Sequence, residues 1–170
     1  MKATVLSGSY LVNIMEKLLL LSLVVFWIAS QNAFAAGAPA KSSKSAAEKR
    51  TEANVHFEEG QKLQEAGSYK EASKKYEKTV KVDSKYAEAW SNLGYTYRKL
   101  GDFKKAVKAY KKALDLDPNL AEAHEYLGEA YAEKGKFDLA EKELKILREL
   151  GSDEADELEA FITRMKAKKS

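Results

Sequence analysis

The chain has no cysteine and only two prolines and two histidines among its 170 residues. Without cysteine it can form no disulfide or thiolate metal site, and it offers no cysteine nucleophile or cysteine for a lipid anchor. Its net charge of +3 is too small to indicate a nucleic-acid-binding protein. With 45% hydrophobic and 32% charged residues, the composition is typical of helices that pack on one face and are solvated on the other.

The sequence also lacks the patterns that would indicate catalysis. It contains no phosphate-binding loop and neither a G-x-S-x-G nor an H-E-x-x-H pattern. Clustered glutamates are possible calcium ligands, but helices rarely supply the six to eight oxygens that calcium needs. His56 and His124 stand two repeat periods apart, too far to share a metal ion, and we expect each to pack between the helices of its own repeat unit. The sequence therefore predicts a protein that is not an enzyme and binds no cofactor.

The first 35 residues have the features of a secretory signal peptide. Lys17 precedes an apolar run at 18–29, and a small-x-small ending follows, which predicts cleavage after Ala35. Because residues from Met15 onward form a complete signal by themselves, Met15 is a candidate for the true start. The alternative is an uncleaved membrane anchor, since the uncharged stretch after Lys17 is long enough to span a bilayer. Either case predicts that the remainder faces an extracytoplasmic compartment, as a periplasmic or secreted protein.

An internal repeat of 34 residues follows a flexible linker predicted at 36–50. Gly60, Gly94 and Gly128 coincide when the sequence is shifted by this period, and alanines, aromatic residues and a second set of glycines also align. A period of this length indicates a solenoid or a related array. The repeat predicts three units with these bounds: 53–86, 87–120 and 121–154.

Each unit has the pattern of two helices. In the second unit, Trp90, Leu93 and Tyr97 lie at helical spacing before a break at Gly101, and a second apolar stripe follows. Glycine suits the end of a helix, where a positive φ is needed. Proline disfavours helical geometry in the residue before it, so Pro118 ends the second helix. The sequence therefore predicts helix-turn-helix units.

The second unit closely resembles the tetratricopeptide repeat consensus. The residues that carry the resemblance are Trp90, Leu93, Gly94, Tyr97, Ala106, Tyr110, Ala113 and Pro118. The third unit matches nearly as well, with His124 in place of the tryptophan and Ser152 in place of the proline. The first unit is the weakest, because Glu59 and Thr79 replace a usual leucine and a usual alanine. The resemblance implies an all-α fold, a right-handed superhelical solenoid of three repeats.

A further amphipathic helix is predicted at 155–168. Leu158, Phe161, Ile162 and Met165 form a stripe at i, i+3, i+4 and i+7. We expect this helix to cover the apolar end of the third unit, as capping helices do in repeat proteins.

The resemblance also implies where a partner binds. In this family the first helices of the units line a concave groove that holds an extended peptide or a helix of another protein. The corresponding places hold Asn54, Phe57, Gln61, Gln64, Glu88, Ser91, Asn92, Tyr95, Arg98, Lys99, Glu122, Glu125, Tyr126, Glu129 and Glu133. One subfamily clamps the C-terminal carboxylate of a chaperone with Lys, Asn, Asn, Lys and Arg. Those places hold Phe57, Gln61, Asn92, Glu122 and Tyr126 here, so the clamp is not expected.

The third unit offers an acidic face instead. Glu122, Glu125, Glu129 and Glu133 are spaced for one side of a helix, and we expect this stripe to lie beside an aromatic surface of Phe57, Tyr95 and Tyr126. Such a groove favours a basic or amphipathic segment. The alternative is a solubilising helix face.

Lysines gather instead on the second helices of the first two units. We interpret them as a solvated outer face, with attraction to anionic lipid or to an envelope polymer as the alternative. Their positions are Lys70, Lys74, Lys75, Lys78, Lys104, Lys105, Lys108, Lys111 and Lys112.

Together these patterns predict a non-catalytic adaptor or scaffold outside the cytoplasm, which binds another protein and no nucleic acid. Two alternatives stay open. One is an accessory subunit of an envelope assembly, such as a secretion, pilus or cytochrome-maturation machine. The other is a membrane protein that is anchored through the uncleaved signal.

Overall fold

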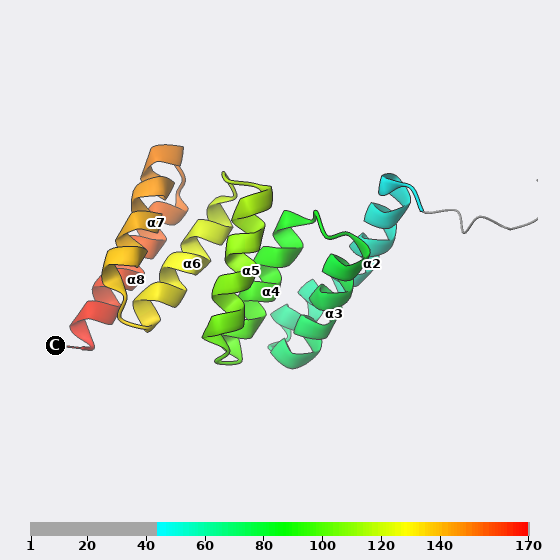
Figure 1. The fold of residues 1–170 in the computed structure, drawn as a ribbon. Coiled ribbons are helices and arrows are strands. Elements are labelled where there is room, and N and C mark those ends of the chain that lie inside the picture. Colours follow the sequence, from blue (N-terminus) through cyan, green and yellow to red (C-terminus); the bar gives the residue numbers. More distant parts are fainter. Residues whose placement is uncertain (1–43, 170) are drawn as a thin grey trace, which may run out of the picture. The chain divides into compact units, whose positions relative to one another are not determined.

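The computed structural model describes residues 44–169, which form seven α-helices and no strand (Figure 1). The helices are α2 (Ala46–Glu65), α3 (Tyr69–Val82), α4 (Ala87–Lys99), α5 (Phe103–Leu116), α6 (Ala121–Glu133), α7 (Phe137–Leu150) and α8 (Glu154–Ala167). This all-α architecture confirms the predicted fold class. The predicted signal peptide and most of the predicted linker lie outside the described residues. Among the described helices, none is both long enough and apolar enough to span a bilayer.

The helices pair in chain order, as the repeat predicts. α2 packs on α3, α4 on α5 and α6 on α7, while α8 packs on both α6 and α7 (Figure 1). The turn inside each pair contains a glycine with positive φ: 72° at Gly67, 82° at Gly101 and 71° at Gly135. Residues with a Cβ rarely adopt this conformation, so the glycines fix where each first helix stops.

A second set of glycines allows the paired helices to approach closely. A Cβ on Gly94 would lie 2.6 Å from the ring of Tyr110, and one on Gly60 would lie 2.7 Å from the ring of Tyr76. The tyrosine of each second helix therefore rests directly on the backbone of the first. In the third unit, the side chain of Leu158 from α8 takes this place, 2.5 Å from a Cβ built on Gly128.

The apolar core of the described residues divides into two clusters. Tyr76, Val80, Ala89 and Leu93 belong to the first cluster, which joins α3 to α4. The second cluster extends from α5 to α8 and includes Tyr110, Leu127, Leu147, Leu158 and Ile162. Tyr97 is half-buried and packs against both. The position of α8 in the second cluster agrees with a capping role.

The first helix begins earlier than predicted. Residues 46–50, which we assigned to the linker, form the first turns of α2. Ser45 caps the helix: its Oγ accepts a hydrogen bond from the backbone N–H of Glu48, and the Glu48 carboxylate accepts one from the N–H of Ser45. This reciprocal capping box satisfies two helix-terminal donors. Arg50 then pairs with Asp83 at 2.6 Å and lies 4.0 Å from the centroid of the Tyr86 ring, which ties the early turns to the fold.

The histidines pack locally. His124 is buried, with Nδ1 2.7 Å from a carboxylate oxygen of Glu143 on α7 and Nε2 3.0 Å from the carbonyl oxygen of Pro118. It therefore joins the two helices of its own unit, as predicted. His56 is half-buried, and its Nδ1 lies 3.7 Å from Glu59 on the same helix.

Candidate partner-binding face

Most of the predicted binding residues of α2, α4 and α6 are brought onto one surface by contacts between neighbouring first helices. The side-chain amide of Gln64 donates a hydrogen bond to Asn92 Oδ1 over 3.5 Å, and the rings of Tyr95 and Tyr126 have centroids 5.0 Å apart. We call this surface the first-helix face. Its accessible members are Asn54, Gln61, Gln64, Glu88, Tyr95, Lys99, Glu122, Tyr126, Glu129 and Glu133.

Arg98 is the buried centre of this face between α4 and α6. Only 6% of its surface is exposed, and its guanidinium contacts Glu129 at 2.5 Å and Glu133 at 2.7 Å. Burial opposes the charge of Arg98, but Glu129, Tyr110 and Glu133 together raise its pKa, so it remains cationic. Arg98 therefore neutralises the second half of the predicted negative stripe. The reason is that the last turn of α4 lies beside the last turn of α6, which places Arg98 between the two carboxylates.

The charge of the first two glutamates of the stripe, Glu122 and Glu125, is not balanced by a cation of the described residues. Within the described residues, no ion pair is formed by Glu122 or Glu125, although Glu125 is only 9% exposed. Burial, together with repulsion from Glu129, Glu157 and other carboxylates, raises the pKa of Glu125 to about 8. Burial also raises the pKa of Glu122, against the opposing effect of the Tyr126 hydroxyl. Much of the Glu125 population therefore holds a proton at neutral pH.

Two further acids on α8 belong to the same group. Glu154 and Glu157 repel Glu125, and Glu154 also repels Glu122. We call Glu122, Glu125, Glu154 and Glu157 the acidic cluster. Sequence reasoning missed its α8 half, because we treated the capping helix only as a cover for the core. The spacing of Glu154 and Glu157 on one side of that helix, at i and i+3, could have indicated it.

The aromatic part of the face differs from the prediction. Tyr95 lies between Tyr69 and Tyr126, with ring centroids 6.1 and 5.0 Å away. Phe57, which we expected beside Tyr95 and Tyr126, packs instead against Tyr86 at 4.8 Å and against Tyr76. Its ring therefore packs on the core of the first repeat, because the middle of α2 lies against Tyr86, in the turn that leads into α4. Tyr69, at the start of α3, takes its place on the aromatic surface.

The polar side chains of α2 and α4 offer fewer accessible atoms to a partner than predicted. Asn54 Oδ1 and Gln64 Oε1 are buried and accept no hydrogen bond from the described residues. Asn92 is only 6% exposed and Ser91 is fully buried, so neither is offered to a partner as predicted. Both were aligned with groove positions by register, but Asn92 is held by Gln64 of the adjacent first helix and the Ser91 hydroxyl is buried. Within the described part of the chain, no group of acidic or histidine side chains could hold a metal ion.

These features define the class of protein: a helical repeat array whose first helices present amides, tyrosines and carboxylates on one surface. Tetratricopeptide repeat models match residues 87–120 and 109–142, and a TPR repeat model matches residues 60–101. The chain is a tetratricopeptide repeat protein. Proteins of this family are interaction modules, typically without catalysis, and this chain is accordingly a protein–protein interaction adaptor.

Several solved structures resemble it. The first TPR of Spaghetti (RPAP3), bound to the HSP90 peptide SRMEEVD, is 26% identical with a TM-score of 0.62 over 69% of this chain and 95% of that one. MamA is 27% identical with a TM-score of 0.56 over 58% of each chain. The Arabidopsis OM64 TPR domain shares the fold, with 19% identity and a TM-score of 0.62 over 68% of this chain and 98% of that one. The curated proteins include no significant match.

Proposed function

We propose that this protein is a non-catalytic adaptor in an extracytoplasmic compartment, which holds a basic peptide or a basic amphipathic helix of a partner on its first-helix face. The observation that carries the proposal is the acidic cluster. Glu122 and Glu125 are withdrawn from water beside other carboxylates, and no cation of the described residues pairs with either of them.

A basic side chain from a partner would supply the positive charge that the acidic cluster lacks. Opposite charges a few ångströms apart at a partly buried site interact by about 4 kcal/mol before desolvation is subtracted. A lysine or arginine of the partner therefore stabilises Glu125 as a carboxylate and lowers its pKa. The ring pair of Tyr95 and Tyr126 adds a surface for the stem of that side chain or for its cation.

The same residues argue against an acidic chaperone tail. The related RPAP3 domain is bound to the peptide SRMEEVD, which ends in acidic residues and a free carboxylate. In this chain, the places of the carboxylate clamp hold a core phenylalanine, Phe57, and a half-buried glutamate, Glu122. Because Glu122 would repel a carboxylate, the protein is expected to discriminate against such tails.

A pair of matched synthetic peptides tests the proposal. Both have the same leucine face on a helix of about 16 residues, and they differ only in carrying lysine or glutamate on the polar face. We expect the lysine peptide to bind the first-helix face and the SRMEEVD peptide not to bind. Glu122→Gln with Glu125→Gln should weaken the lysine peptide about tenfold or more, because each charged hydrogen bond is worth about 1.5–3 kcal/mol. Isothermal titration calorimetry measures both effects.

The pH dependence and a control variant sharpen the test. The pKa of Glu125 is about 8 in the free protein, so affinity for the lysine peptide should rise from pH 6 to pH 9 as the carboxylate form becomes available. Glu141→Gln with Glu149→Gln removes the same charge from two exposed positions of α7 and should leave affinity nearly unchanged. Equal losses in the two double variants would show that binding follows net charge alone, and the face assignment would be wrong.

The extracytoplasmic location rests on residues 1–35, whose basic start, apolar run and small-x-small ending are typical of a signal peptide. N-terminal sequencing of the protein recovered from its cells is expected to begin near Ala36. Recovery of an intact Lys17–Ala40 segment in the membrane fraction would support an anchor instead. An accessory subunit of an envelope assembly would differ by stable co-purification with that assembly.

A further inference from the structure

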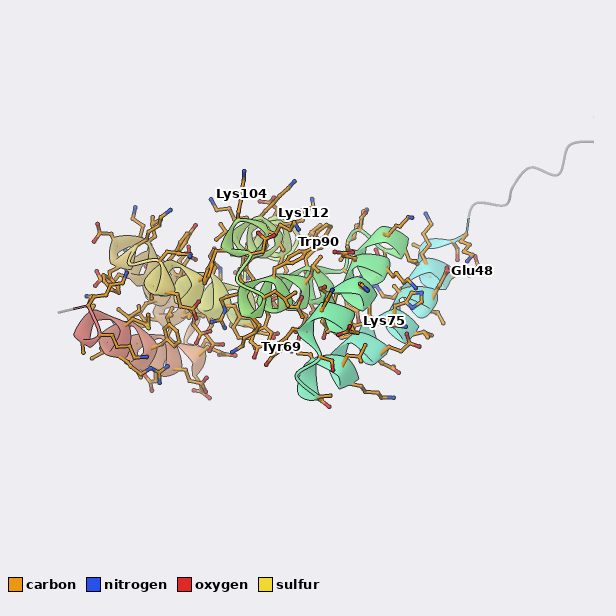
Figure 2. The ribbon with its side chains drawn as sticks, turned by 90° about the horizontal axis from the view of Figure 1, so that it is seen from below. Glu48, Tyr69, Lys75, Trp90, Lys104 and Lys112 are labelled. Atoms are coloured by element: carbon orange, nitrogen blue, oxygen red, sulfur yellow. The ribbon has the colours of Figure 1, made fainter. Side chains whose placement is uncertain are left out.

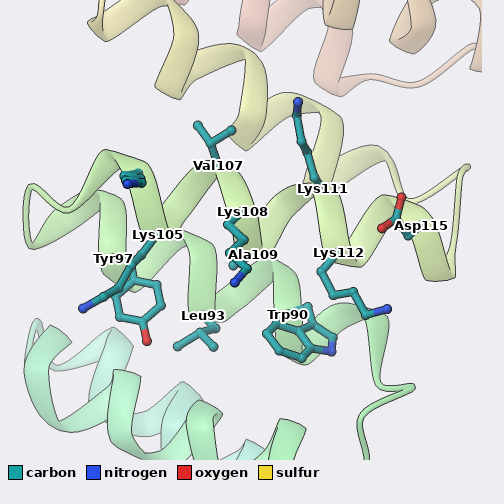
Figure 3. Close-up of a pocket in the computed structure, with 11 residues that line it drawn as sticks. Trp90, Leu93, Tyr97, Lys105, Val107, Lys108, Ala109, Lys111, Lys112 and Asp115 are labelled. Atoms are coloured by element: carbon teal, nitrogen blue, oxygen red, sulfur yellow. The ribbon is translucent and has the colours of Figure 1, made fainter.

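A groove with a volume of about 820 Å³ lies on the outer side of the second repeat (Figure 3). It is separate from the first-helix face, and α4 and α5 supply its lining. Figure 2 shows Lys104 and Lys112 on one side of the molecule, with Trp90 beneath them. The lining residues are Trp90, Leu93, Tyr97, Lys104, Lys105, Val107, Lys108, Ala109, Lys111, Lys112 and Asp115.

The floor of the groove is apolar and aromatic. Trp90, Leu93 and Tyr97 lie in a row along α4, at i, i+3 and i+7 (Figure 3). Trp90 is half-buried, and its indole N–H donates a hydrogen bond to the carbonyl of Ser84 at 3.0 Å, which fixes the ring. The Tyr97 hydroxyl donates to Glu77 on α3 at 2.7 Å. The floor is therefore held rigidly by contacts of its own.

Three lysines on α5 have the same intervals of three and four residues as the floor residues of α4. Lys105, Lys108 and Lys112 extend from α5 toward the row formed by Tyr97, Leu93 and Trp90 (Figure 3). The ammonium group of Lys105 lies 5.2 Å from the centroid of the Tyr97 ring and 3.0 Å from Asp102. The groove thus joins an apolar strip to a parallel strip of positive charge.

Most of this positive charge has no ion-pair partner among the described residues. Within residues 44–169, no ion pair involves Lys104, Lys108, Lys111 or Lys112, and all four are exposed. The acids near the groove are Glu77, Asp102 and Asp115; Glu77 accepts a hydrogen bond from Tyr97, and Asp102 pairs with Lys105. Five lysines on three turns of one helix therefore face a single lining acid. Such a field attracts a partner of opposite charge.

The other repeats do not reproduce this combination. The places of Trp90 are taken by His56 and His124, and the place of Lys112 in the third repeat is taken by Ile146. The place of Lys105 holds Glu71 in the first repeat. Because Trp90 is also a residue of the repeat consensus, it is the complete row of lysines at 105, 108 and 112 that distinguishes the second repeat.

We propose that this outer groove is a second docking site, which takes an acidic amphipathic helix from a protein partner. The helix would lay its apolar side on Trp90, Leu93 and Tyr97 and direct its carboxylates toward Lys108 and Lys112. The lining of α5 from Lys104 to Asp115 is about 16 Å long, the length of about three helical turns. In helix-in-groove recognition, the bound helix places its apolar anchors at i, i+3 and i+7. The floor residues of α4 have the same spacing.

The recessed floor favours a helix over an anionic membrane. Helices that bind bilayers present exposed apolar side chains, often aromatic, for insertion. Here the outward side of α5 carries lysines, while Val107 is half-buried and Trp90 lies below them on α4. A flat lipid surface would meet only the ammonium groups, whereas a narrow helix can reach the floor between them.

The glutamate peptide described above is the probe, and the full chain with Trp27→Phe leaves Trp90 as its single tryptophan. We expect this peptide to shift Trp90 emission to shorter wavelength, because its leucines replace water at the ring. Lys108→Glu with Lys112→Glu should weaken binding at least tenfold. Lys142→Glu with Lys145→Glu makes the same charge change on the outer side of α7 and should have little effect.

Several results would overturn this proposal. These are an unchanged Trp90 emission, equal losses in the two lysine variants, or equal binding of a sequence-scrambled glutamate peptide. Phosphatidylglycerol vesicles that shift Trp90 emission as strongly as the peptide would assign the groove to lipid. The variants also separate the two sites: Glu122→Gln with Glu125→Gln should affect only the lysine peptide. Either proposal can therefore fail without the other.

Discussion

Removal of residues 154–169 is expected to destabilise the protein by several kcal/mol and to make it prone to aggregation. In the intact chain, α8 buries Leu158 completely and Ile162 to 4% exposure. Each large apolar side chain that is fully buried contributes about 1.5–3 kcal/mol. The truncation would also uncover Gly128, whose surface is closely covered by Leu158. Chemical denaturation followed by circular dichroism measures the loss.

A point substitution makes the same test without removing a helix. Leu158→Ala should lower the free energy of unfolding by about 2–5 kcal/mol, because it leaves a cavity against Gly128 that the helices cannot close. Thr163→Ala changes an exposed position on the same helix and should stay within about 0.5 kcal/mol of the unchanged protein. An unaltered melting temperature for both the truncated chain and Leu158→Ala would show that α8 is not a structural cap.

Replacement of Arg98 is expected to have an effect of similar size. Arg98→Met keeps much of the apolar stem but leaves Glu129 and Glu133 without their cation. Breaking a buried ion pair by removing one partner costs about 3–5 kcal/mol, since the remaining charge stays desolvated. A triple variant that also carries Glu129→Gln and Glu133→Gln should recover most of the loss. Recovery in the triple variant separates charge repulsion from lost packing.

The loss in Arg98→Met should depend on pH. Burial already raises the pKa of Glu129 above its usual value, and Arg98 opposes that rise. Without Arg98, folded Glu129 binds its proton still more tightly than the unfolded chain does. A carboxylate with a raised pKa in the folded state loses stability as pH increases, so the defect should be larger at pH 8 than at pH 5. A pH-independent defect would contradict this account of the ion pair.

The sequence predicts the fold well because each of the three repeat units carries the same residues at the helix ends and at the packing contacts. The glycines at 67, 101 and 135 end the first helices, and those at 60, 94 and 128 permit close packing, as their spacing implies. Periodicity failed only where a single local interaction decided the outcome. The capping box of Ser45 and Glu48 lies outside the repeat, so the start of α2 could not be located from the period.

The binding face was less predictable, because it depends on contacts between repeats. Helical spacing correctly grouped Glu122, Glu125, Glu129 and Glu133, but it carries no information about what lies opposite. Arg98 neutralises two of them from the preceding repeat, and α8 adds Glu154 and Glu157 beside the other two. Register also placed Phe57 in the groove, whereas its ring completes the core. Which side of a residue is covered is set by neighbouring helices, and a single-repeat pattern does not contain that information.

The division of the apolar core into two clusters means that the repeats need not open together. α5 to α8 share one continuous cluster, and the buried ion pairs of Arg98 add a link from α4 to α6. α2 and α3 are joined to α4 by the smaller cluster of Tyr76, Val80, Ala89 and Leu93, by a long hydrogen bond from Gln64 to Asn92 and by the ring contact of Phe57 with Tyr86. In an array with nearest-neighbour coupling, the less strongly linked end opens first. Amide hydrogens of α2 and α3 should therefore exchange with solvent before those of α6 and α7, so the first repeat can loosen while the acidic cluster stays assembled.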